Sequence, residues 1–380
     1  MLADVVLCFS HLRWGFVFQR PNHLMIRAAR GRRVFYIEEP VFDGEVARLH
    51  TEEVAPGMLR VVPQVVPGDP EPEARVGALL EELCRREHIE HAIHWYYTPM
   101  MLGVSAHLPR DFVVYDCMDE LANFLFAPPE LQERERELLR LADVVFTGGR
   151  ALYEAKRSLH RNVHAMPSSV DVAHFERARG VLAEPGDQAT IPRPRLGYCG
   201  VVDERMDLEL IVGIAQRRPD WQLVMLGPVV KIDPAQLPRV HNIHYLGLKT
   251  YDELPAYLSG WDAALLPFAL NDATRYISPT KTPEYLAAGK PVVSTPIRDV
   301  VEPYGRLGIV HIATGADAFV SAIERALAEQ DSELDARRDA LLREMSWDAT
   351  WQHMLHELET AGARRTPRAA KAEIASDSHV

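Results

Sequence analysis

A segment in the second half of the chain combines a lysine, a hydroxyl and a carboxylate at a predicted turn into a helix. It reads SPTKTPEYLAAGKPVVST. Residues 278–280 (Ser278, Pro279, Thr280) predict a turn, residues 281–288 a short helix, and Gly289 the end of that helix. An anion at the start of such a helix meets unpaired N–H groups, the Thr280 hydroxyl and the Lys281 ammonium. The segment therefore favours a diphosphate site.

Glu284 lies inside the first turns of the same predicted helix. Its carboxylate could accept hydrogen bonds from the paired hydroxyls of a ribose. On spacing alone, an ordinary strand–helix connection explains the segment equally well, with Lys281 solvated and Glu284 acting only as a cap. Both interpretations stay open at this level.

The elements that would hold this segment recur along the whole chain. Short apolar runs are each followed by a polar or helical stretch, which is typical of buried parallel strands joined by crossover helices. The predicted strands are 5–9, 34–37, 59–66, 92–97, 112–115, 144–147 and 163–166 in the first half, and 196–199, 223–226, 243–246, 263–266, 291–295 and 309–312 in the second. Both halves therefore predict doubly wound α/β domains.

The segments between the runs set the domain limits. We predict an N-terminal domain over 1–180, a Gly- and Pro-rich linker over 181–194, a C-terminal domain over 195–345, a terminal helix over 346–362 and a disordered tail over 363–380. Ser346 can N-cap the terminal helix, and Trp347, Trp351 and Leu358 share one apolar stripe on it. Such a stripe needs a surface to cover.

Composition narrows the class of protein. A length of 380 residues favours two domains. The formal net charge of −12 argues against general affinity for nucleic acid and allows only a local basic patch. The four cysteines are far apart in sequence, which indicates neither a disulfide framework nor a zinc site and favours a reducing cytoplasm. The apolar run from Val5 to Phe9 is too short for a signal peptide or a membrane span.

Three other chemistries are disfavoured by missing motifs. The segment FSHLRWGFVF, after the first predicted strand, lacks the Gly-x-Gly-x-x-Gly of a dinucleotide site. The Gly289-Lys290 pair is no P-loop, because Glu284 stands where that loop needs its first glycine. The histidines spaced three apart lack the glutamate of a zinc protease, and the sequence has no Asp-x-Asp. We therefore expect no metal and no cofactor, and any phosphate must be neutralised by side chains and backbone.

Taken together, these segments resemble GT-B glycosyltransferases, in particular family 4, the retaining group 1 transferases of polysaccharide and glycoconjugate assembly. SPTKTPEYLAAGKPVVST looks like the second half of their donor-site motif. The segments MPSSVDVAHF, GYCGVVDERMDLELI and YLGLKTYDELPAYLSGWDAALLPF extend the similarity over nearly the whole chain. The resemblance implies two facing Rossmann-like domains, a C-terminal helix that crosses back to the first domain, and a UDP- or GDP-linked sugar as co-substrate.

The resemblance also implies roles for single residues. Lys281 matches the family's phosphate-binding lysine, Arg205 lies in the loop of a phosphate-binding arginine, and Glu284 matches the second glutamate of a Glu-x7-Glu motif. The implied donor-binding set is Gly200, Arg205, Leu248, Lys249, Asp272, Ser278, Pro279, Thr280, Lys281 and Glu284, with Arg205 and Lys281 also catalytic.

One position departs from the family motif. Tyr276 stands where the first glutamate belongs, and Asp272 or Asn271 on the same loop are the candidate substitutes. The departure keeps two alternatives to sugar transfer open. One is a nucleotide-sugar 2-epimerase on the same scaffold, and the other is a catalytically silent, donor-binding partner of another transferase.

The first domain is expected to bind a hydroxyl-bearing acceptor. Strands of an open α/β sheet present their carboxyl ends to the crevice, and several polar or aromatic residues follow two of these strands. The candidate acceptor residues are His11, Arg13, Trp14 and Arg20 after the first strand, and Asp116, Asp119 and Glu120 after another. The first loop favours an anionic or ring-shaped acceptor, and Asp119 is the candidate hydroxyl binder or general base. Alternatively, Trp14 is core, the arginines are surface residues, and Asp116 or Asp119 caps a turn.

Arg27, Arg30, Arg32 and Arg33 form a basic cluster near the end of a predicted helix. The cluster predicts either peripheral contact with anionic lipid at the inner membrane face or compensation of a helix dipole. The expected location is cytoplasmic, with such peripheral attachment as an option.

Overall fold

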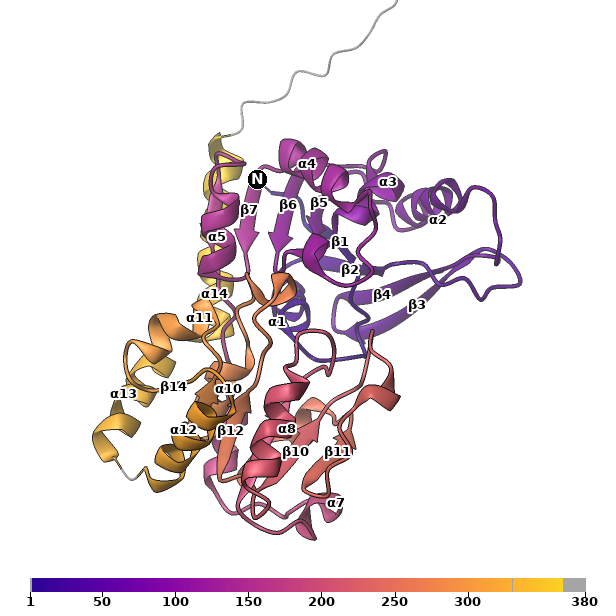
Figure 1. Cartoon of the computed structure of the whole chain (residues 1–380). Coiled ribbons are helices and arrows are strands. Elements are labelled where there is room, and N and C mark those ends of the chain that lie inside the picture. The colour runs from indigo at the N-terminus through magenta and orange to yellow at the C-terminus, as the bar shows by residue number, and fades with distance from the viewer. Residues whose placement is uncertain (1, 330, 365–380) are drawn as a thin grey trace, which may run out of the picture.

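The structure is a computed structural model, and it describes residues 2–329 and 331–364. The predicted tail over 363–380 lies outside the described residues from position 365 onward. Two sheets, one mainly and one wholly parallel, form two domains that face each other (Figure 1).

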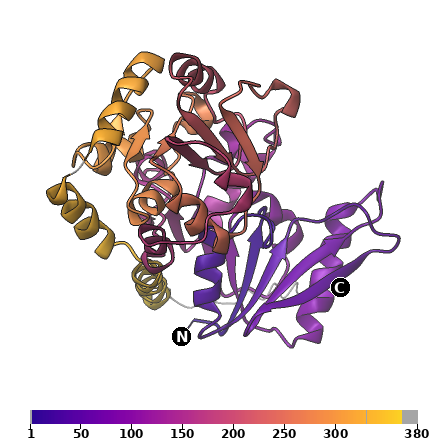
Figure 2. The ribbon, with the colours of Figure 1, turned by 90° about the horizontal axis from the view of Figure 1, so that it is seen from below.

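The first domain contains an eight-stranded sheet in the order β3-β4-β2-β1-β5-β6-β7-β8. Its strands are β1 Val5–Ser10, β2 Arg33–Glu38, β3 Arg48–Ala55, β4 Met58–Gln64, β5 Ile93–Tyr96, β6 Phe112–Cys117, β7 Val144–Thr147 and β8 Val163–Ala165. All pairings are parallel except that of β3 with β4. The β3–β4 pair projects from the edge of the sheet, away from the second domain (Figure 2).

The strand β3 was not among the sequence predictions. Its sequence, RLHTEEVA, is largely polar, and its residues are exposed or half-buried throughout. A strand with a buried face shows an apolar pattern, but an edge strand that pairs only with β4 needs none.

Helices cover both faces of the first sheet. Their bounds are α1 Arg20–Ala28, α2 Pro72–Arg86, α3 Leu102–Ser105, α4 Leu131–Leu141 and α5 Arg150–Lys156, with short turns η1 Pro99–Met101 and η2 Leu121–Asn123. Alternate residues of β1 enter different cores: Leu7 and Phe9 pack with α2 and α4, whereas Val6 and Cys8 pack with α1. This period of two is what a buried strand requires.

The last helix, α14 Trp347–Arg364, crosses back and lies along the first domain (Figure 1). Trp347, Trp351 and Leu358 are buried in the same core as α1 and β1. The Ser346 hydroxyl accepts a hydrogen bond from the N–H of Ala349 at 3.0 Å, which caps the helix as predicted. Each fully buried large side chain of this stripe contributes about 1.5–3 kcal/mol, so the helix ties the end of the chain to its beginning.

The second domain contains a six-stranded parallel sheet in the order β11-β10-β9-β12-β13-β14. Its strands are β9 Arg195–Cys199, β10 Gln222–Leu226, β11 Ile243–Gly247, β12 Ala263–Leu266, β13 Val292–Ser294 and β14 His311–Ile312. Its helices are α8 Leu208–Arg217, α9 Leu254–Ser259, α10 Lys281–Ala287, α11 Arg298–Val300, α12 Ala316–Ala328 and α13 Ser332–Arg343. Short turns are η4 Pro234–Gln236, η5 Tyr251–Glu253, η6 Asp272–Thr274 and the π-helical η7 Val301–Gly305.

The predicted limit at residue 180 is too late. The elements α6 Val172–Glu176 and η3 Arg177–Arg179 precede it, yet Phe175 and Ala178 are buried in the core of the second domain. The predicted linker is also anchored there, because Gln188 of α7 Gly186–Ala189 is fully buried and accepts a hydrogen bond from Trp261 Nε1 at 2.9 Å. The Gly- and Pro-rich composition marks irregular backbone rather than a free connection.

None of the helices within residues 2–329 and 331–364 is both long and apolar enough to span a membrane. All four cysteines are free and buried.

Candidate functional site

Three cavities adjoin one another in the cleft between the domains. The lower cavity, about 440 Å³, lies beside β10 and β11; the central cavity, about 140 Å³, lies at the start of α10; and the upper cavity, about 390 Å³, lies beside η2. Val17 of the first domain and Val201 of the second line all three. The three cavities therefore lie next to one another where the two domains face each other.

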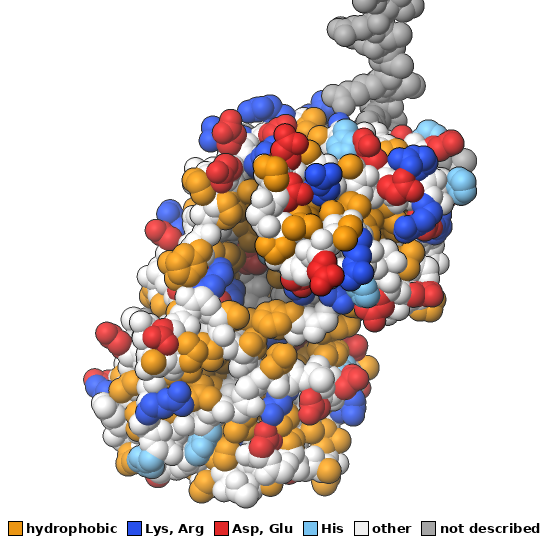
Figure 3. Space-filling view, turned by 90° about the vertical axis from the view of Figure 1, so that its right-hand side faces the viewer, with side chains coloured by type: hydrophobic (Ala, Val, Ile, Leu, Met, Phe, Trp, Pro, Cys, Tyr) orange, Lys and Arg blue, Asp and Glu red, His pale blue; other side chains and the backbone are white. Residues whose placement is uncertain are grey.

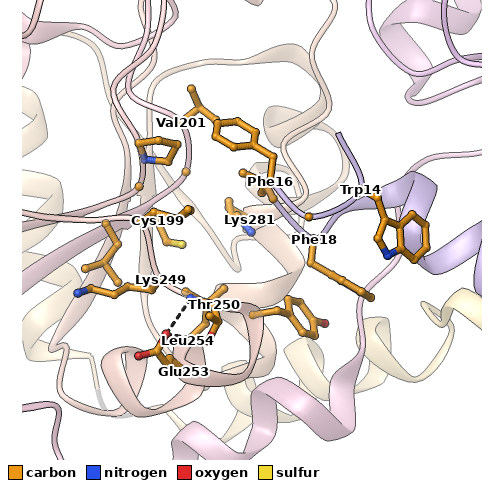
Figure 4. Close-up of a pocket in the computed structure, with 18 residues that line it drawn as sticks. Trp14, Phe16, Phe18, Cys199, Val201, Lys249, Thr250, Glu253, Leu254 and Lys281 are labelled. Carbon is orange, nitrogen blue, oxygen red and sulfur yellow. Dashed lines mark hydrogen bonds between the residues drawn. The ribbon is translucent and has the colours of Figure 1, made fainter. Parts of the chain in front are cut away.

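The lower cavity is built from the carboxyl ends of the second sheet and roofed by the loop after β1. Gly200, Leu248, Lys249 and Lys281 of the predicted donor set line it. Figure 4 shows Trp14, Phe16 and Phe18 of the first domain on the side of the cavity opposite Lys249. The cavity is large enough for a nucleoside, and its walls are mainly apolar, as a flat base requires.

A close backbone approach shapes the floor between the lower and central cavities. Gly227 follows β10 with a φ of 138°, and a Cβ atom there would lie 1.8 Å from the carbonyl oxygen of Gly200. Only glycine fits this position, because any side chain would strike the backbone after β9.

The central cavity brings together the two predicted phosphate-binding cations. Arg205 and Lys281 line it, together with Ser278, Pro279 and Thr280. These residues are 76 positions apart in sequence, and both lie at the carboxyl edge of the sheet, which is where ligands bind in open α/β folds. The structure thus assembles the central part of the predicted donor set.

Lys281 is held in place by Glu284. Its Nζ donates a hydrogen bond to Glu284 Oε2 at 2.6 Å, and both side chains are largely buried. Burial acts to lower the pKa of Lys281, but the neighbouring carboxylate outweighs it, so the pKa is raised and the ammonium stays charged. Glu284 lines none of the three cavities. Its carboxylate is bound to the lysine, and its predicted ribose contact stays a prediction.

Arg205 is oriented by two partners that the sequence analysis missed. Asp203 accepts hydrogen bonds from Arg205 Nε at 3.0 Å and Nη2 at 2.7 Å. The Phe124 ring of the first domain lies 5.4 Å from the guanidinium carbon, and Lys231 Nζ lies 4.7 Å from the same ring. The sequence places Asp203 two residues before Arg205, so this partner could have been found. Phe124 belongs to the other domain, and no sequence pattern indicates its contact with Arg205.

Asp119 lies where the central and upper cavities meet. It lines both, as does Arg205. Burial raises the pKa of Asp119 to about 6, and the nearby Arg205 and Lys231 only partly oppose this. A carboxyl with such a pKa can accept a proton near neutral pH, and the predicted role of Asp119 as a hydroxyl binder or general base stays a prediction.

Two of the predicted acceptor residues are engaged elsewhere. Arg20 and Asp116 are fully buried, and they form a bidentate ion pair with Arg20 Nη2 2.9 Å from Asp116 Oδ1. Arg20 Nη1 also donates to the carbonyl of Met166 at 2.6 Å. The pair ties the start of α1 to the ends of β6 and β8, so its role is structural and the acceptor assignment was wrong for both.

Glu120 and Arg13 are likewise held by neighbouring residues. Glu120 lies 2.7 Å from Lys156 Nζ, and Arg13 lies 3.2 Å from Glu38. Neither lines the three cavities. Trp14 lines the lower cavity rather than the upper one, so it faces the donor side. Of the predicted acceptor residues, His11 and Asp119 lie in the upper cavity.

The loop with Tyr276 is arranged differently from the prediction. Asp272 is exposed and lines none of the cavities, and its carbonyl accepts a hydrogen bond from Asn123 Nδ2 at 3.0 Å. Tyr276 packs against the core of the first domain. Asp272 therefore does not replace the missing glutamate here, and Tyr276 serves as a contact between domains.

The basic cluster also has internal partners. Arg27 and Arg30 lie 2.9 and 2.6 Å from Asp348 on α14, and Arg33 lies 2.7 Å from Glu87. These pairs give three of the four arginines a role within the first domain. Membrane contact through the cluster stays a prediction. Within residues 2–329 and 331–364, the His, Cys, Asp and Glu side chains form no group that could hold a metal ion.

Comparisons with known proteins agree with this architecture. Residues 193–329, which form most of the second domain, match the family model of "Glycosyl transferases group 1". Over 310 residues the chain is 24% identical to the Bacillus subtilis (strain 168) protein named "Putative teichuronic acid biosynthesis glycosyltransferase TuaH", covering 74% of this chain and 75% of that protein.

Solved structures share the fold over nearly the whole chain. The sucrose-phosphate synthase of Thermosynechococcus elongatus has a TM-score of 0.68 and 16% identity, covering 96% of this chain and 100% of that chain. A Burkholderia xenovorans trehalose-phosphate synthase in complex with glucose-6-phosphate has a TM-score of 0.67 and 14% identity, covering 93% of this chain and 100% of that chain. A structure described as "Trehalose-6-phosphate from E. coli bound with UDP-2-fluoro glucose" has a TM-score of 0.66 and 12% identity, covering 96% of this chain and 100% of that chain. The fold is therefore GT-B, with two Rossmann-like domains.

Proposed function

We propose that the protein is a glycosyltransferase of the group 1 type, the class to which its matches belong. In this proposal it moves a sugar from a nucleotide diphosphate donor to a hydroxyl acceptor, with retention and without a metal. One observation carries the proposal. Arg205 and Lys281 line a small central cavity that opens on one side to an apolar cavity of nucleoside size and on the other to Asp119. A nucleotide sugar laid along this path has its base in the lower cavity and its diphosphate between the two cations.

The chemistry follows from this placement. The bond between the anomeric carbon and the diphosphate oxygen breaks, and the acceptor oxygen bonds to the same carbon. Arg205 and Lys281 stabilise the negative charge that develops on the leaving phosphate, as preorganised cations do in a water-poor site. The acceptor proton passes to the leaving phosphate on the same face, or to Asp119. Attack on that face retains the anomeric configuration.

Replacing Lys281 by alanine is expected to weaken nucleotide diphosphate binding by about 1–3 kcal/mol, because a charge-assisted contact to phosphate is lost. Calorimetric titration of UDP, GDP, ADP and TDP into the wild type and Lys281→Ala measures this. Arg298→Ala is the matched control, because Arg298 is an exposed cation of the same domain that lines none of the three cavities. Equal affinity in the wild type and Lys281→Ala would remove the lysine from the donor site.

Replacing Asp119 by asparagine should spare nucleotide affinity and lower transfer by about 10²-fold or more, the usual range for a positioned acid or base. The carboxylate form is present above its pKa of about 6, so kcat/KM of the wild type should fall as the pH drops through 6. A pH profile of both proteins tests this, with Asp272→Asn as the exposed control. An unchanged profile in Asp119→Asn would exclude the carboxylate from the mechanism.

The alternatives make different predictions. A 2-epimerase releases free nucleotide from its donor without any acceptor, whereas a silent partner binds nucleotide and turns over nothing. Asp119 beside the cation pair favours a catalyst over a silent partner, because a protein that only binds the donor needs no carboxyl at that position.

A further inference from the structure

The upper cavity differs in character from the central one. Its wall is mainly apolar, and it is formed by the loop after β1 and the segment from η2 to the start of α4. Figure 3 shows hydrophobic side chains along the border of the hollow between the domains. The apolar residues of the first domain that line it include Phe16, Met100, Leu121, Leu125, Phe126 and Leu131.

Three of these side chains are exposed although they are large and apolar. Phe16 is 39% exposed, Leu125 43% and Phe126 77%. Single exposed apolar residues are common, but several that converge on one cavity mark a surface that an apolar group covers. The cavity adjoins Asp119 and Arg205, so the group that covers it belongs to a molecule whose hydroxyl reaches the donor sugar.

The backbone holds Phe126 in this exposed position. Its φ is 63°, in the left-handed region that residues other than glycine, asparagine and aspartate rarely adopt. The preceding residue is fixed to the second domain, because the N–H of Leu125 donates to Glu204 Oε1 at 3.0 Å. The exposed ring and the strained backbone of Phe126 are both unfavourable for folding, and a role in binding a ligand would account for them.

The charges of the upper cavity argue against an anionic acceptor. Its cations are Arg205 and Lys231, and its carboxylates are Glu39, Asp119 and Asp203. Arg205 is paired with Asp203, and Lys231 lies 3.6 Å from Glu204. His11, the remaining basic group among the described lining residues, has a pKa lowered to about 4 by burial and the nearby Lys231, so it is neutral at pH 7. A phosphate in this cavity would meet more negative than positive charge.

We propose that the acceptor is an uncharged molecule that carries an aliphatic chain or an aromatic ring next to its reacting hydroxyl. The hydroxyl lies between Asp119 and the donor sugar, and the apolar group lies on Phe16, Leu125 and Phe126. The inference rests on the proposed function and specifies its acceptor. It also replaces the anionic acceptor that the basic loop suggested, because Arg13 and Arg20 of that loop are bound to Glu38 and Asp116.

The test compares three small probes by ligand-observed NMR titration of the intact protein. The probes are n-octyl β-D-glucoside below its micelle concentration, methyl β-D-glucoside and glucose 6-phosphate. We expect the octyl glucoside to bind about tenfold or more tightly than the methyl glucoside, a ratio that burial of about two methylene groups supplies. Glucose 6-phosphate should bind no better than the methyl glucoside.

Variants assign the effect to the cavity wall. Phe126→Asn removes the ring and keeps a residue that tolerates a positive φ. It should reduce the octyl preference to about threefold or less, and Leu125→Ser should reduce it as well. Phe42→Asn is the control, because Phe42 is 52% exposed in the same domain but lines none of the three cavities.

Equal binding of the octyl and methyl glucosides, tighter binding of glucose 6-phosphate, or an octyl preference that survives Phe126→Asn would each overturn the proposal. Nucleotide titration in the same samples keeps the two hypotheses apart. Loss of nucleotide binding contradicts the proposed function, whereas normal nucleotide binding without an octyl preference contradicts only the acceptor class.

Discussion

Arg205→Ala is expected to lower the rate of sugar transfer by about 10²–10³-fold, the loss typical of removing one group that stabilises transition-state charge. The guanidinium lines the central cavity and is held by Asp203 and the Phe124 ring. It is therefore oriented without a ligand, and under the proposed function its charge would act where the leaving phosphate becomes more negative. Initial rates at saturating donor, with nucleotide affinity measured in parallel, separate this effect from weaker binding.

Two variants control for charge and for general damage. Arg205→Lys keeps the charge but loses the bidentate contact to Asp203, so its rate should lie between those of the wild type and Arg205→Ala. Arg218→Ala removes an arginine that pairs with Asp220 outside the three cavities, and it should leave the rate unchanged. A rate for Arg205→Ala within about threefold of the wild type would contradict the assigned role, because a transition-state contact is worth far more.

Arg20→Ala is expected to destabilise the first domain by about 3–5 kcal/mol, because it leaves Asp116 buried without its partner. Both side chains are fully buried, and the guanidinium also satisfies the carbonyl of Met166. Urea unfolding followed by circular dichroism measures the loss.

The double variant Arg20→Met with Asp116→Leu removes both charges, and it should recover much of the stability lost in Arg20→Ala. The exposed pair of Arg30 and Asp348 supplies a comparison, because Arg30→Ala should cost at most about 1 kcal/mol. Arg20→Ala with the stability of the wild type would show that the ion pair is not structural.

The central parallel strands were predictable because they are buried apolar runs. Val144–Thr147 and Ala263–Leu266 have the predicted limits, and both are fully buried. The edge strand Arg48–Ala55 escaped notice, since its pairing with β4 leaves no apolar signature. The domain limit was placed too late for a related reason: sequence shows that Phe175 is apolar, but not which of two cores receives it.

The candidate site was predictable in part. Lys281 and Arg205 follow strands of one parallel sheet, and the carboxyl ends of such strands meet at one edge, so their meeting in the central cavity follows from the topology. The same rule misplaced Arg20 and Asp116, because it identifies residues near the crevice but not those that bind each other first. A guanidinium and a carboxylate that are buried away from water must be paired, so they bind each other and are not free to bind a ligand.

The contacts that cross the cleft could not be predicted. Phe124 reaches Arg205 from the other domain, and Tyr276 packs against the first core from the second domain's loop. Such contacts depend on how the two domains dock, and local sequence patterns do not predict domain docking.

The most direct test of the central claim is release of nucleotide diphosphate from UDP- and GDP-sugars with EDTA present, measured with and without hydroxyl acceptors that carry an apolar group. We predict that one donor gives acceptor-dependent release that persists in EDTA, is strongly reduced in Arg205→Ala, and yields a product with the donor's anomeric configuration by NMR. Release that needs no acceptor, release that EDTA abolishes, or nucleotide binding without turnover on any acceptor would contradict the account.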